Sequence, residues 1–248
     1  MKDKNTPDNV LIVIPAYNEE ASIGALLQEI RVLYGGWDIL VVNDHSADRT
    51  PEVVRRYKGT MTVDLPRNLG IGGAVQTGFI YAARNHYDYV VQLDADGQHQ
   101  PADIIRLLEP LKKEETDVVI GSRFCNGKSS YRAGFARRTG IRIISFFCWL
   151  LTGKKVKDCT SGFRAYNREA IQFLSEYYPI DYPEPEAVIM LIKNRFRISE
   201  IQVCMHPRKA GKSSISFRRG TTYYMFKVVL GMIMTAIRPK TRKYGKLQ

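Results

Sequence analysis

The sequence predicts an α/β fold in which a mostly parallel, twisted sheet carries helices on both faces. The first 120 residues alternate between short apolar runs and segments of helical periodicity, as expected of strands joined by covering helices. Pro51 and Pro101 fall where first helical turns are expected. The predicted strands span residues 10–14, 39–42, 89–93 and 118–120, and the predicted helices span residues 19–33, 47–57 and 101–111.

The alternation fades beyond residue 120. Residues 121–123 end a predicted strand, residues 126–132 are a polar loop, and residues 138–151 predict a helix with a strongly apolar face. Residues 158–164 indicate a loop that enters a short strand. With 248 residues, the chain fits one large domain with an appendage.

The positive charge of the chain is concentrated near its carboxyl terminus. Residues 193–248 contain 14 Lys and Arg but a single acid, Glu200, whereas the other 192 residues have a net charge of −1. This asymmetry predicts a polyanionic partner, either nucleic acid or an anionic membrane.

An apolar stretch within this basic segment favours a membrane surface over nucleic acid as the polyanionic partner. Residues 223–237 are apolar apart from Lys227, but 15 residues are fewer than the roughly 20 that span a bilayer. Basic residues flank the stretch on both sides: Arg218, Arg219, Arg238 and Lys240. We therefore expect residues 216–248 to be a basic tail with an amphipathic helix that associates with a membrane surface. A terminal helix packed on the domain remains the alternative.

The amino terminus and the cysteines indicate the cytoplasm. Residues 1–9 are polar and Pro15 interrupts the first apolar run, so no secretory leader is expected. The four cysteines lack metal-ligand spacing, which favours buried thiols in a reducing compartment.

Acidic residues follow several of the predicted strands. Asp94 and Asp96 come directly after the run 89–93, while Glu19 and Asp44 follow the first two strands. In parallel sheets, ligands bind beyond the carboxyl ends of the strands. Two adjacent carboxylates repel each other unless a cation lies between them, and a divalent metal that holds phosphates is the common solution. The alternative is a surface turn, since Gly97 follows.

Three common nucleotide or metal motifs are absent from the sequence. Val75 replaces the third glycine of a dinucleotide fingerprint that begins at Gly70, and His206 occupies the first glycine position of a Walker A loop. A calcium loop starting at Asp94 would need glycine where His99 stands.

A set of motifs at 15–20, 41–46, 67–70 and 92–96 resembles family 2 of the inverting, nucleotide-sugar-dependent glycosyltransferases, which have the GT-A fold. Further motifs at 121–123, 158–166 and 208–214 are similar to the branch containing dolichol-phosphate mannose synthase and bacterial polyprenyl-phosphate glycosyltransferases. The resemblance covers about residues 8–215. It implies a GT-A domain over residues 1–215, with a nucleotide-sugar half at about 8–122 and an acceptor half at about 123–215.

The resemblance also implies roles for individual residues. The donor would contact Pro15, Tyr17, Glu19, Asp44, Asn68, Gly70, Asp94, Arg208 and Lys212. Mg²⁺ or Mn²⁺ would bind Asp94, Asp96 and Gln98, and catalysis would depend on Asp96, Arg123 and Asp158. The acceptor phosphate would contact Arg137, Arg138 and Arg164, although Ile141 stands where the family often has a serine after the first of these.

The expected reaction is metal-dependent transfer of a sugar, with inversion, from a nucleotide diphosphate sugar to a polyprenyl phosphate. A lipid phosphate is already anionic at neutral pH, its second pKa being about 6, so no catalytic base is required. The expected location is the inner face of the cell membrane, reached by peripheral contact or through a separate membrane protein. The sequence does not distinguish the sugar, or GDP from UDP.

Two alternatives remain. A glycosyltransferase acting on a saccharide hydroxyl would need a base such as Asp158 or Glu184. A basic nucleic-acid-binding protein is disfavoured, because the aromatic residues at 223, 224 and 226 cluster within an apolar helix instead of alternating with basic residues.

Overall fold

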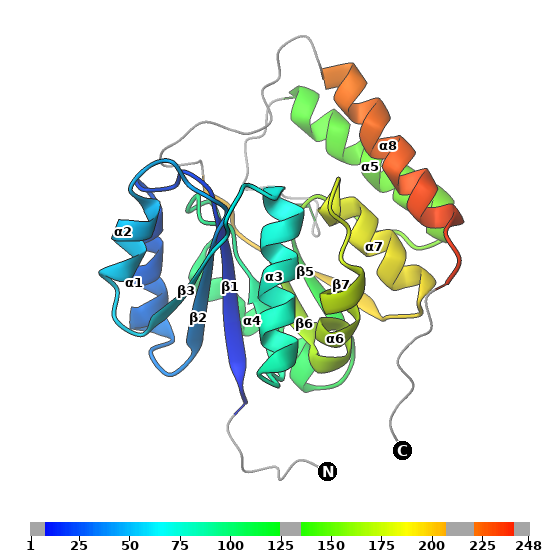
Figure 1. Ribbon diagram of the computed structural model, residues 1–248. Coiled ribbons are helices and arrows are strands. Elements are labelled where there is room, and N and C mark those ends of the chain that lie inside the picture. The colour runs from blue at the N-terminus through cyan, green and yellow to red at the C-terminus, as the bar shows by residue number, and fades with distance from the viewer. Residues whose placement is uncertain (1–7, 125–134, 207–220, 241–248) are drawn as a thin grey trace.

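The computed structural model describes residues 8–124, 135–206 and 221–240, and its centre is a seven-stranded sheet (Figure 1). The strand order is β3-β2-β1-β4-β6-β5-β7, and β6 alone among these strands runs antiparallel to its neighbours. The predicted mostly parallel sheet is therefore confirmed. The strands are β1 (Val10–Ala16), β2 (Asp38–Asn43), β3 (Thr60–Asp64), β4 (Tyr89–Gln92), β5 (Val118–Ser122), β6 (Arg164–Asn167) and β7 (Ile198–Gln202).

Helices cover both faces of the sheet, as predicted. One face packs on α1 (Ile23–Leu33), α2 (Thr50–Arg55) and α4 (Ile104–Lys112), which follows the short 3-10 helix η1 (Pro101–Asp103). The other face packs on α3 (Gly70–Arg84), α6 (Arg168–Tyr177) and α7 (Pro183–Lys193). Successive residues of a strand point to opposite faces, so in β1 Leu11 and Val13 join one core and Ile12 and Ile14 join the other.

The structure contains several elements that the sequence analysis did not predict: β3, α3, α6, α7 and β7. Edge strand β3 is only partly buried, so it lacks the long apolar run of an inner strand. Helix α3 begins Gly-Ile-Gly-Gly, a composition more typical of a loop. Its glycines allow close packing: a Cβ atom on Gly72 would lie 2.5 Å from the Ile180 carbonyl oxygen, and one on Gly78 would lie 2.3 Å from a Val13 methyl group.

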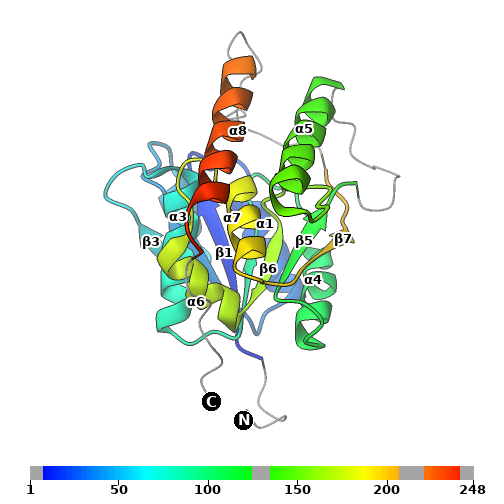
Figure 2. The same cartoon turned by 90° about the vertical axis from the view of Figure 1, so that its right-hand side faces the viewer.

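Helices α5 (Phe135–Thr152) and α8 (Thr221–Ile237) extend beyond the carboxyl-terminal edge of the sheet, side by side (Figures 1 and 2). Both were predicted as helices. In the part of the chain that the structure describes, no helix combines the length and apolar character needed to cross a bilayer.

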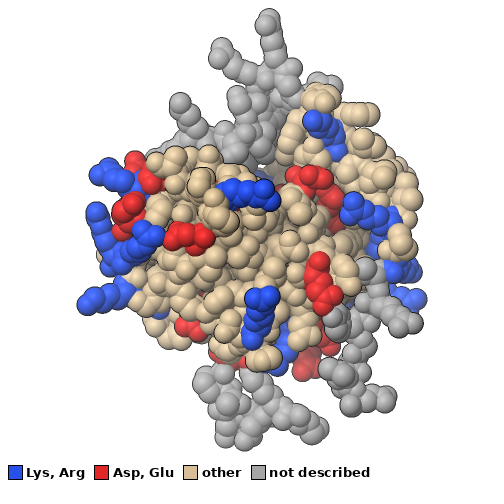
Figure 3. Space-filling model, viewed as in Figure 1, with Lys and Arg blue, Asp and Glu red and all other residues tan. Residues whose placement is uncertain are grey.

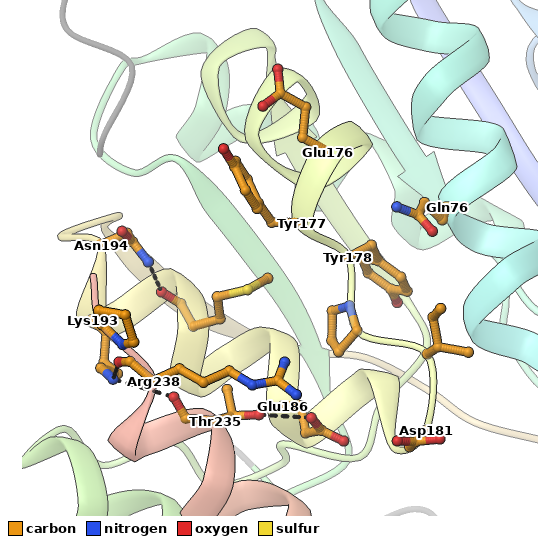
Figure 4. Close-up of a pocket in the computed structure, with 14 residues that line it drawn as sticks. Gln76, Glu176, Tyr177, Tyr178, Asp181, Glu186, Lys193, Asn194, Thr235 and Arg238 are labelled. Atoms are coloured by element: carbon orange, nitrogen blue, oxygen red, sulfur yellow. Dashed lines mark hydrogen bonds between the residues drawn. The ribbon is translucent and has the colours of Figure 1, made fainter. Parts of the chain in front are cut away.

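Hydrogen bonds join the carboxyl end of α8 to α7. The Lys193 ammonium donates hydrogen bonds to the carbonyl oxygens of Thr235 (3.2 Å), Ala236 and Arg238 (2.6 Å), and the Thr235 hydroxyl donates to the buried Glu186 carboxylate (2.7 Å; Figure 4). A lysine at this end also complements the helix dipole. These contacts line a cavity of about 410 Å³ whose lining residues include none of the strand-end acids.

The outer side of α8 differs from the amphipathic helix that we expected. Phe226, Leu230 and Ile237 are exposed there, with Lys227 among them, so the outer side is largely apolar. The upper part of this region is mostly uncharged in the space-filling view, while Lys and Arg gather over α2 at the left and along the right-hand margin below it (Figure 3). One side of α8 therefore packs on the domain, as the alternative of a packed terminal helix predicted. The other side leaves apolar surface uncovered.

The close approach of α3 to β1 predicts that Gly78→Ala destabilises the protein by about 1–3 kcal/mol, because the added methyl group overlaps Val13. Urea unfolding measures the change. Gly140→Ala in α5 is the matched control, since its Cβ atom would lie 3.7 Å from the nearest heavy atom. This control should be neutral or stabilising by up to about 1 kcal/mol. Equal effects of the two substitutions would contradict the packing described here.

Candidate active site

The predicted site residues converge at one edge of the sheet. Strands β1, β2, β4 and β5 are parallel and end there, and antiparallel β6 begins there. The register pairs Ala16 with Asn43 and pairs Arg164 with both Gln92 and Ile120. Asp44, Asp94 and Arg123 lie one, two and three residues beyond this row, so the two acids share a rim as the sequence analysis expected.

Three of the predicted donor residues form one connected loop structure. The buried Asp44 carboxylate accepts a hydrogen bond from the Leu69 amide (2.7 Å), and the Asn68 side chain donates to the Asp44 carbonyl oxygen (3.3 Å). The Gly70 amide then donates to the Asn68 side-chain oxygen (3.1 Å). Gly70 has φ +76°, a conformation that favours glycine. This bonding fixes the loop that leads into α3 against the end of β2.

Three further predicted donor residues lie at the end of β1 or on the loop after it. Pro15 is buried within the strand, whereas the Tyr17 ring is 48% exposed at the rim. Glu19 is largely buried: its amide donates to the Thr50 hydroxyl (2.8 Å), and its carboxylate accepts from the Ser22 hydroxyl (2.8 Å). An exposed aromatic face beside a fixed carboxylate can receive a planar base and a ribose hydroxyl.

Asp94 carries an unfavourable negative charge. Burial against protein atoms, together with the charge of Asp96, raises the pKa of Asp94 to about 7, although 36% of its side chain is open at the rim. The Gly162 backbone lies so close that a Cβ atom there would be 2.7 Å from an Asp94 carboxylate oxygen. The site is thus shaped around a carboxylate that protein cations only partly neutralise.

His99 supports Asp94 without supplying a compensating charge. The Asp94 amide donates to His99 Nδ1 (3.3 Å), and the imidazole stacks on Phe163 with ring centroids 5.0 Å apart. Burial lowers the pKa of His99 to about 4, so the ring is neutral at physiological pH. The sequence analysis did not select His99 as a site residue.

The ligand atoms near Asp94 fit a hard divalent cation. The Asp96 carboxylate accepts a hydrogen bond from the Gln98 backbone amide (3.0 Å). This bond closes the short turn that carries both acids. The Gln98 side-chain nitrogen donates to the His206 carbonyl oxygen (3.3 Å), so the amide oxygen is the atom that Gln98 can offer a metal. Among the described residues no group of three His, Cys, Asp or Glu could hold a metal, so substrate oxygens would have to complete the coordination.

Arg123 and Asp158 form a buried ion pair beside these acids. Arg123 Nε donates to Asp158 Oδ2 (2.7 Å), Arg123 Nη2 donates to Asp158 Oδ1 (2.6 Å), and the Arg123 backbone amide donates to Oδ2 (3.0 Å). Burial opposes ionisation, but the hydrogen bonds and charge of Arg123 hold the pKa of Asp158 below its usual value. Asp158 is therefore an orienting partner for Arg123 and is poorly suited to act as a base.

Arg164 has a different place from the one we expected. Its guanidinium is fully buried and donates to the carbonyl oxygens of Ser161 (2.7 Å), Cys159 (2.8 Å) and Glu184 (3.0 Å). These bonds tie the loop before β6 to the start of α7. The acceptor-phosphate role expected for Arg164 does not fit this position, since the side chain has no exposed surface.

The remaining predicted acceptor and loop residues are only partly described. Arg138 is exposed on α5, and Arg137 lies in the same helix but its side chain is outside the described residues. Arg208 and Lys212 also lie outside the described residues.

Glu184 is more prominent in the structure than in the sequence. It lies at the start of α7, where burial and then the negative charge of Asp94 raise the pKa of its carboxyl group, against the opposing charge of Arg164. The only sequence signal was an acidic residue between two prolines. Such a residue reads equally well as an ordinary first-turn acid.

An α/β sheet of this order, with acids at the carboxyl ends of its strands, has the architecture of a GT-A glycosyltransferase. The profile described as "Glycosyl transferase family 2" matches residues 11–174, and the chain belongs to this family and is a glycosyltransferase. The family resemblance inferred from the motifs is thereby confirmed.

Similar proteins of known name act on lipid phosphates. The chain is 30% identical over 244 residues to UDP-N-acetylglucosamine--dolichyl-phosphate N-acetylglucosaminyltransferase of Methanococcus voltae, covering 91% of this chain and 95% of that protein. It is 31% identical over 218 residues to undecaprenyl-phosphate mannosyltransferase of Micrococcus luteus, covering 84% of this chain and 87% of that protein.

The fold also matches a solved structure. Glucosyl-3-phosphoglycerate synthase of Mycobacterium tuberculosis, in complex with Mn²⁺, uridine-diphosphate-glucose and phosphoglyceric acid, superimposes with a TM-score of 0.68. The match covers 94% of this chain and 81% of that chain at 20% identity. At this identity the likeness establishes the GT-A fold.

The raised pKa of Asp94 predicts that Asp94→Asn stabilises the metal-free protein. Its pKa is about 7 in the folded state and 3.8 as a free group, so the ionised carboxylate destabilises the fold fully above pH 7 and progressively less as the pH falls toward 4. At pH 8 the gain should be about 1–2 kcal/mol, less than the whole shift implies because the side chain is partly open to solvent.

Thermal unfolding in a chelator at pH 4 to 8 measures this effect. Asp181→Asn, a change at an exposed acid, is the control and should leave the midpoint unchanged. A pH-independent difference between Asp94→Asn and the wild-type protein would show that ionisation of Asp94 does not destabilise the fold.

Proposed function

We propose that this protein transfers a single sugar, with inversion, from a nucleotide diphosphate sugar to the phosphate of a polyprenol. The observation that carries the proposal is the pairing of two kinds of site at one rim. Asp94 and Asp96 form a cation site, and Arg123 lies close enough for its charge to lower the pKa of Asp94. A reaction between two phosphate-bearing substrates needs both.

The donor half of the site follows from the loops after β1, β2 and β4. Tyr17, Glu19 and Asp44 would receive the base and ribose, while Asn68 and Gly70 hold the Asp44 loop in shape. Pro15, near the end of β1, would contact the donor, and the family resemblance assigns Arg208 and Lys212 to its diphosphate. A divalent cation, Mg²⁺ or Mn²⁺, would be held by Asp94, Asp96 and the Gln98 amide, and would neutralise charge on the departing nucleoside diphosphate.

The acceptor half needs positive charge and no base. A phosphate monoester is already a nucleophile at neutral pH, so the protein has only to position it. Arg123 is the leading contact because Asp158 holds its guanidinium, which is 3% exposed, in one orientation near Asp94. Arg137 and Arg138 at the start of α5 are further candidates. The names of the dolichyl-phosphate and undecaprenyl-phosphate relatives support this choice of acceptor class.

The lipid part of the acceptor would meet α5 and α8. Both helices leave large apolar side chains exposed beyond the rim: Ile143, Phe146, Trp149 and Leu150 on α5, and Tyr223, Phe226, Leu230, Met234 and Ile237 on α8. Arg238 and Lys240 follow α8 directly. Apolar surface beside basic residues suits the inner face of an anionic membrane, which the protein would bind peripherally; recruitment by a separate membrane protein is the alternative.

A transfer assay tests the reaction. Purified protein is incubated with radiolabelled nucleotide sugars, undecaprenyl phosphate and Mn²⁺, and we expect a labelled product that partitions into organic solvent. Asp96→Ala should reduce transfer by at least about 100-fold, since it removes half of the charge that holds the cation, while the far-ultraviolet spectrum stays unchanged. Protein that binds nucleotide but gives no lipid product with any donor would refute the acceptor.

The second candidate is transfer to a saccharide hydroxyl, which requires a base. The raised pKa of Glu184 at the rim favours that residue over the ion-paired Asp158. The same assay separates the two functions. Under the second one, label would appear in a water-soluble saccharide, Glu184→Gln would abolish the product, and the rate would fall as the pH drops through the pKa of that carboxyl group.

The exposed apolar side chains on α8 predict membrane binding. The double substitution Phe226→Glu and Leu230→Glu should weaken binding to vesicles that contain anionic lipid by at least about tenfold, because charge replaces apolar area that would enter the interface. Vesicle flotation measures the bound fraction. Val32→Glu, at an 80% exposed position on α1, is the control and should bind normally. Equal flotation of the wild-type protein and both variants would exclude α8 as the membrane-binding element. A DNA shift assay would test the nucleic-acid alternative.

A further inference from the structure

Glu200 is the single acid in the basic segment 193–248, and neither the predicted site nor the proposed reaction uses it. It lies on β7, one of the two edge strands of the sheet. Its side chain points to the same face as Gln202, two residues further along the strand. Both residues contact the segments that carry the Arg123–Asp158 ion pair.

The Glu200 carboxylate binds the backbone next to Asp158. Oε2 accepts a hydrogen bond from the Lys157 amide (2.8 Å), and Oε1 accepts from the Asp158 amide (2.9 Å). Each oxygen thus receives one of two consecutive amides, and hydrogen bonds to an ionised acceptor are about twice as strong as neutral ones. The Gln202 side chain reinforces the arrangement by donating to the Arg123 carbonyl oxygen (3.2 Å).

Helix α5 holds the same loop from its other side. The Ser145 hydroxyl donates to the Lys157 carbonyl oxygen (2.9 Å). The peptide unit before Asp158 is therefore held between a strand of the sheet and the helix that borders the proposed lipid surface. A loop fixed on two sides keeps the Asp158 carboxylate in one orientation, and the Asp158 carboxylate in turn orients both Nε and Nη2 of Arg123.

We propose that Glu200 is a positioning residue that fixes Arg123 for the acceptor phosphate through the backbone of Asp158. This inference rests on the proposed function for the identity of the phosphate, but the positioning itself is a property of the protein alone. The Glu200 carboxylate binds the backbone of residues 157 and 158, so its effect on the substrate would pass through Asp158 and Arg123.

Glu200→Gln is the informative substitution. A carboxamide keeps the size of the side chain but has one acceptor oxygen, and its NH₂ group would face an amide donor. One of the two backbone bonds is therefore lost, and the Asp158 loop gains freedom. Glu115→Gln is the matched control, since Glu115 is exposed and precedes β5, at the amino-terminal ends of β5 and β7.

The first measurement needs no substrate. Solvent exchange of the Arg123 Nε–H is followed by nitrogen-15 NMR, with the resonance assigned by its loss in Arg123→Lys. We expect exchange at least about fivefold faster in Glu200→Gln than in the wild-type protein or Glu115→Gln, because the Nε–H to Asp158 bond opens more often. An unchanged exchange rate overturns the proposal. Should Glu200→Gln not fold, Glu200→Asp is used, which keeps the charge but shortens the reach and should shift the exchange in the same direction.

The second measurement connects the positioning to the acceptor. Calorimetry with farnesyl phosphate as the probe should show affinity at least about fivefold weaker in Glu200→Gln, with nucleotide binding unchanged. In the Arg123→Ala background, Glu200→Gln should have no further effect, because the two changes act on one contact. A purely structural role for Glu200 would instead weaken both ligands in both backgrounds and overturn the proposal. Wild-type protein that binds nucleotide but no farnesyl phosphate would refute the proposed acceptor, and Nε–H exchange would then decide the role of Glu200.

Discussion

The repulsion between two carboxylates at the end of β4 is the constraint around which the rest of the site is arranged. Asp94 and Asp96 stand on one short turn, and the pKa of Asp94 rises because protein atoms surround it and because Asp96 is near. The neighbouring groups hold the turn without removing the repulsion between the two carboxylates. His99 is neutral, and the Asp94 carboxylate lies where a side chain at position 162 would stand. A fold that keeps such a turn is poised for a cation, and stability is given up locally to gain the binding site.

Positive charge near the acids is divided between two arginines with different tasks. Arg164 is buried and holds three carbonyl oxygens, so it joins the loop before β6 to α7 and lowers the electrostatic cost of Asp94. Arg123 is paired with Asp158, whose loop is held by Glu200 on β7 and by Ser145 on α5. The second arrangement connects an edge strand and a surface helix to one guanidinium. Through these contacts Glu200, the single acid in the basic segment 193–248, would affect the position of Arg123.

Helices α5 and α8 extend the site away from the sheet. Their inner sides pack on α7 and on each other, and Lys193 holds the last carbonyl groups of α8. Their outer sides leave aromatic and aliphatic side chains uncovered, which soluble surfaces usually avoid. Because both helices rise from the rim where the acids lie, a lipid-linked phosphate held at the rim would have its chain beside apolar surface.

The sequence by itself determined the α/β class and the position of the acid pair, because strand periodicity and strand-end chemistry are local patterns. It also predicted helices at 138–151 and 223–237 from their apolar character, and the structure has them at 135–152 and 221–237. Only the tertiary structure decided that β6 is antiparallel, that Arg164 binds backbone carbonyl oxygens whereas Arg123 pairs with Asp158, and that α8 packs on α7. The same arginine side chain serves either role, and its burial depends on partners far along the chain. Glu200 and Asp158, 42 residues apart, meet only because β7 pairs with β5, and no local pattern records that contact.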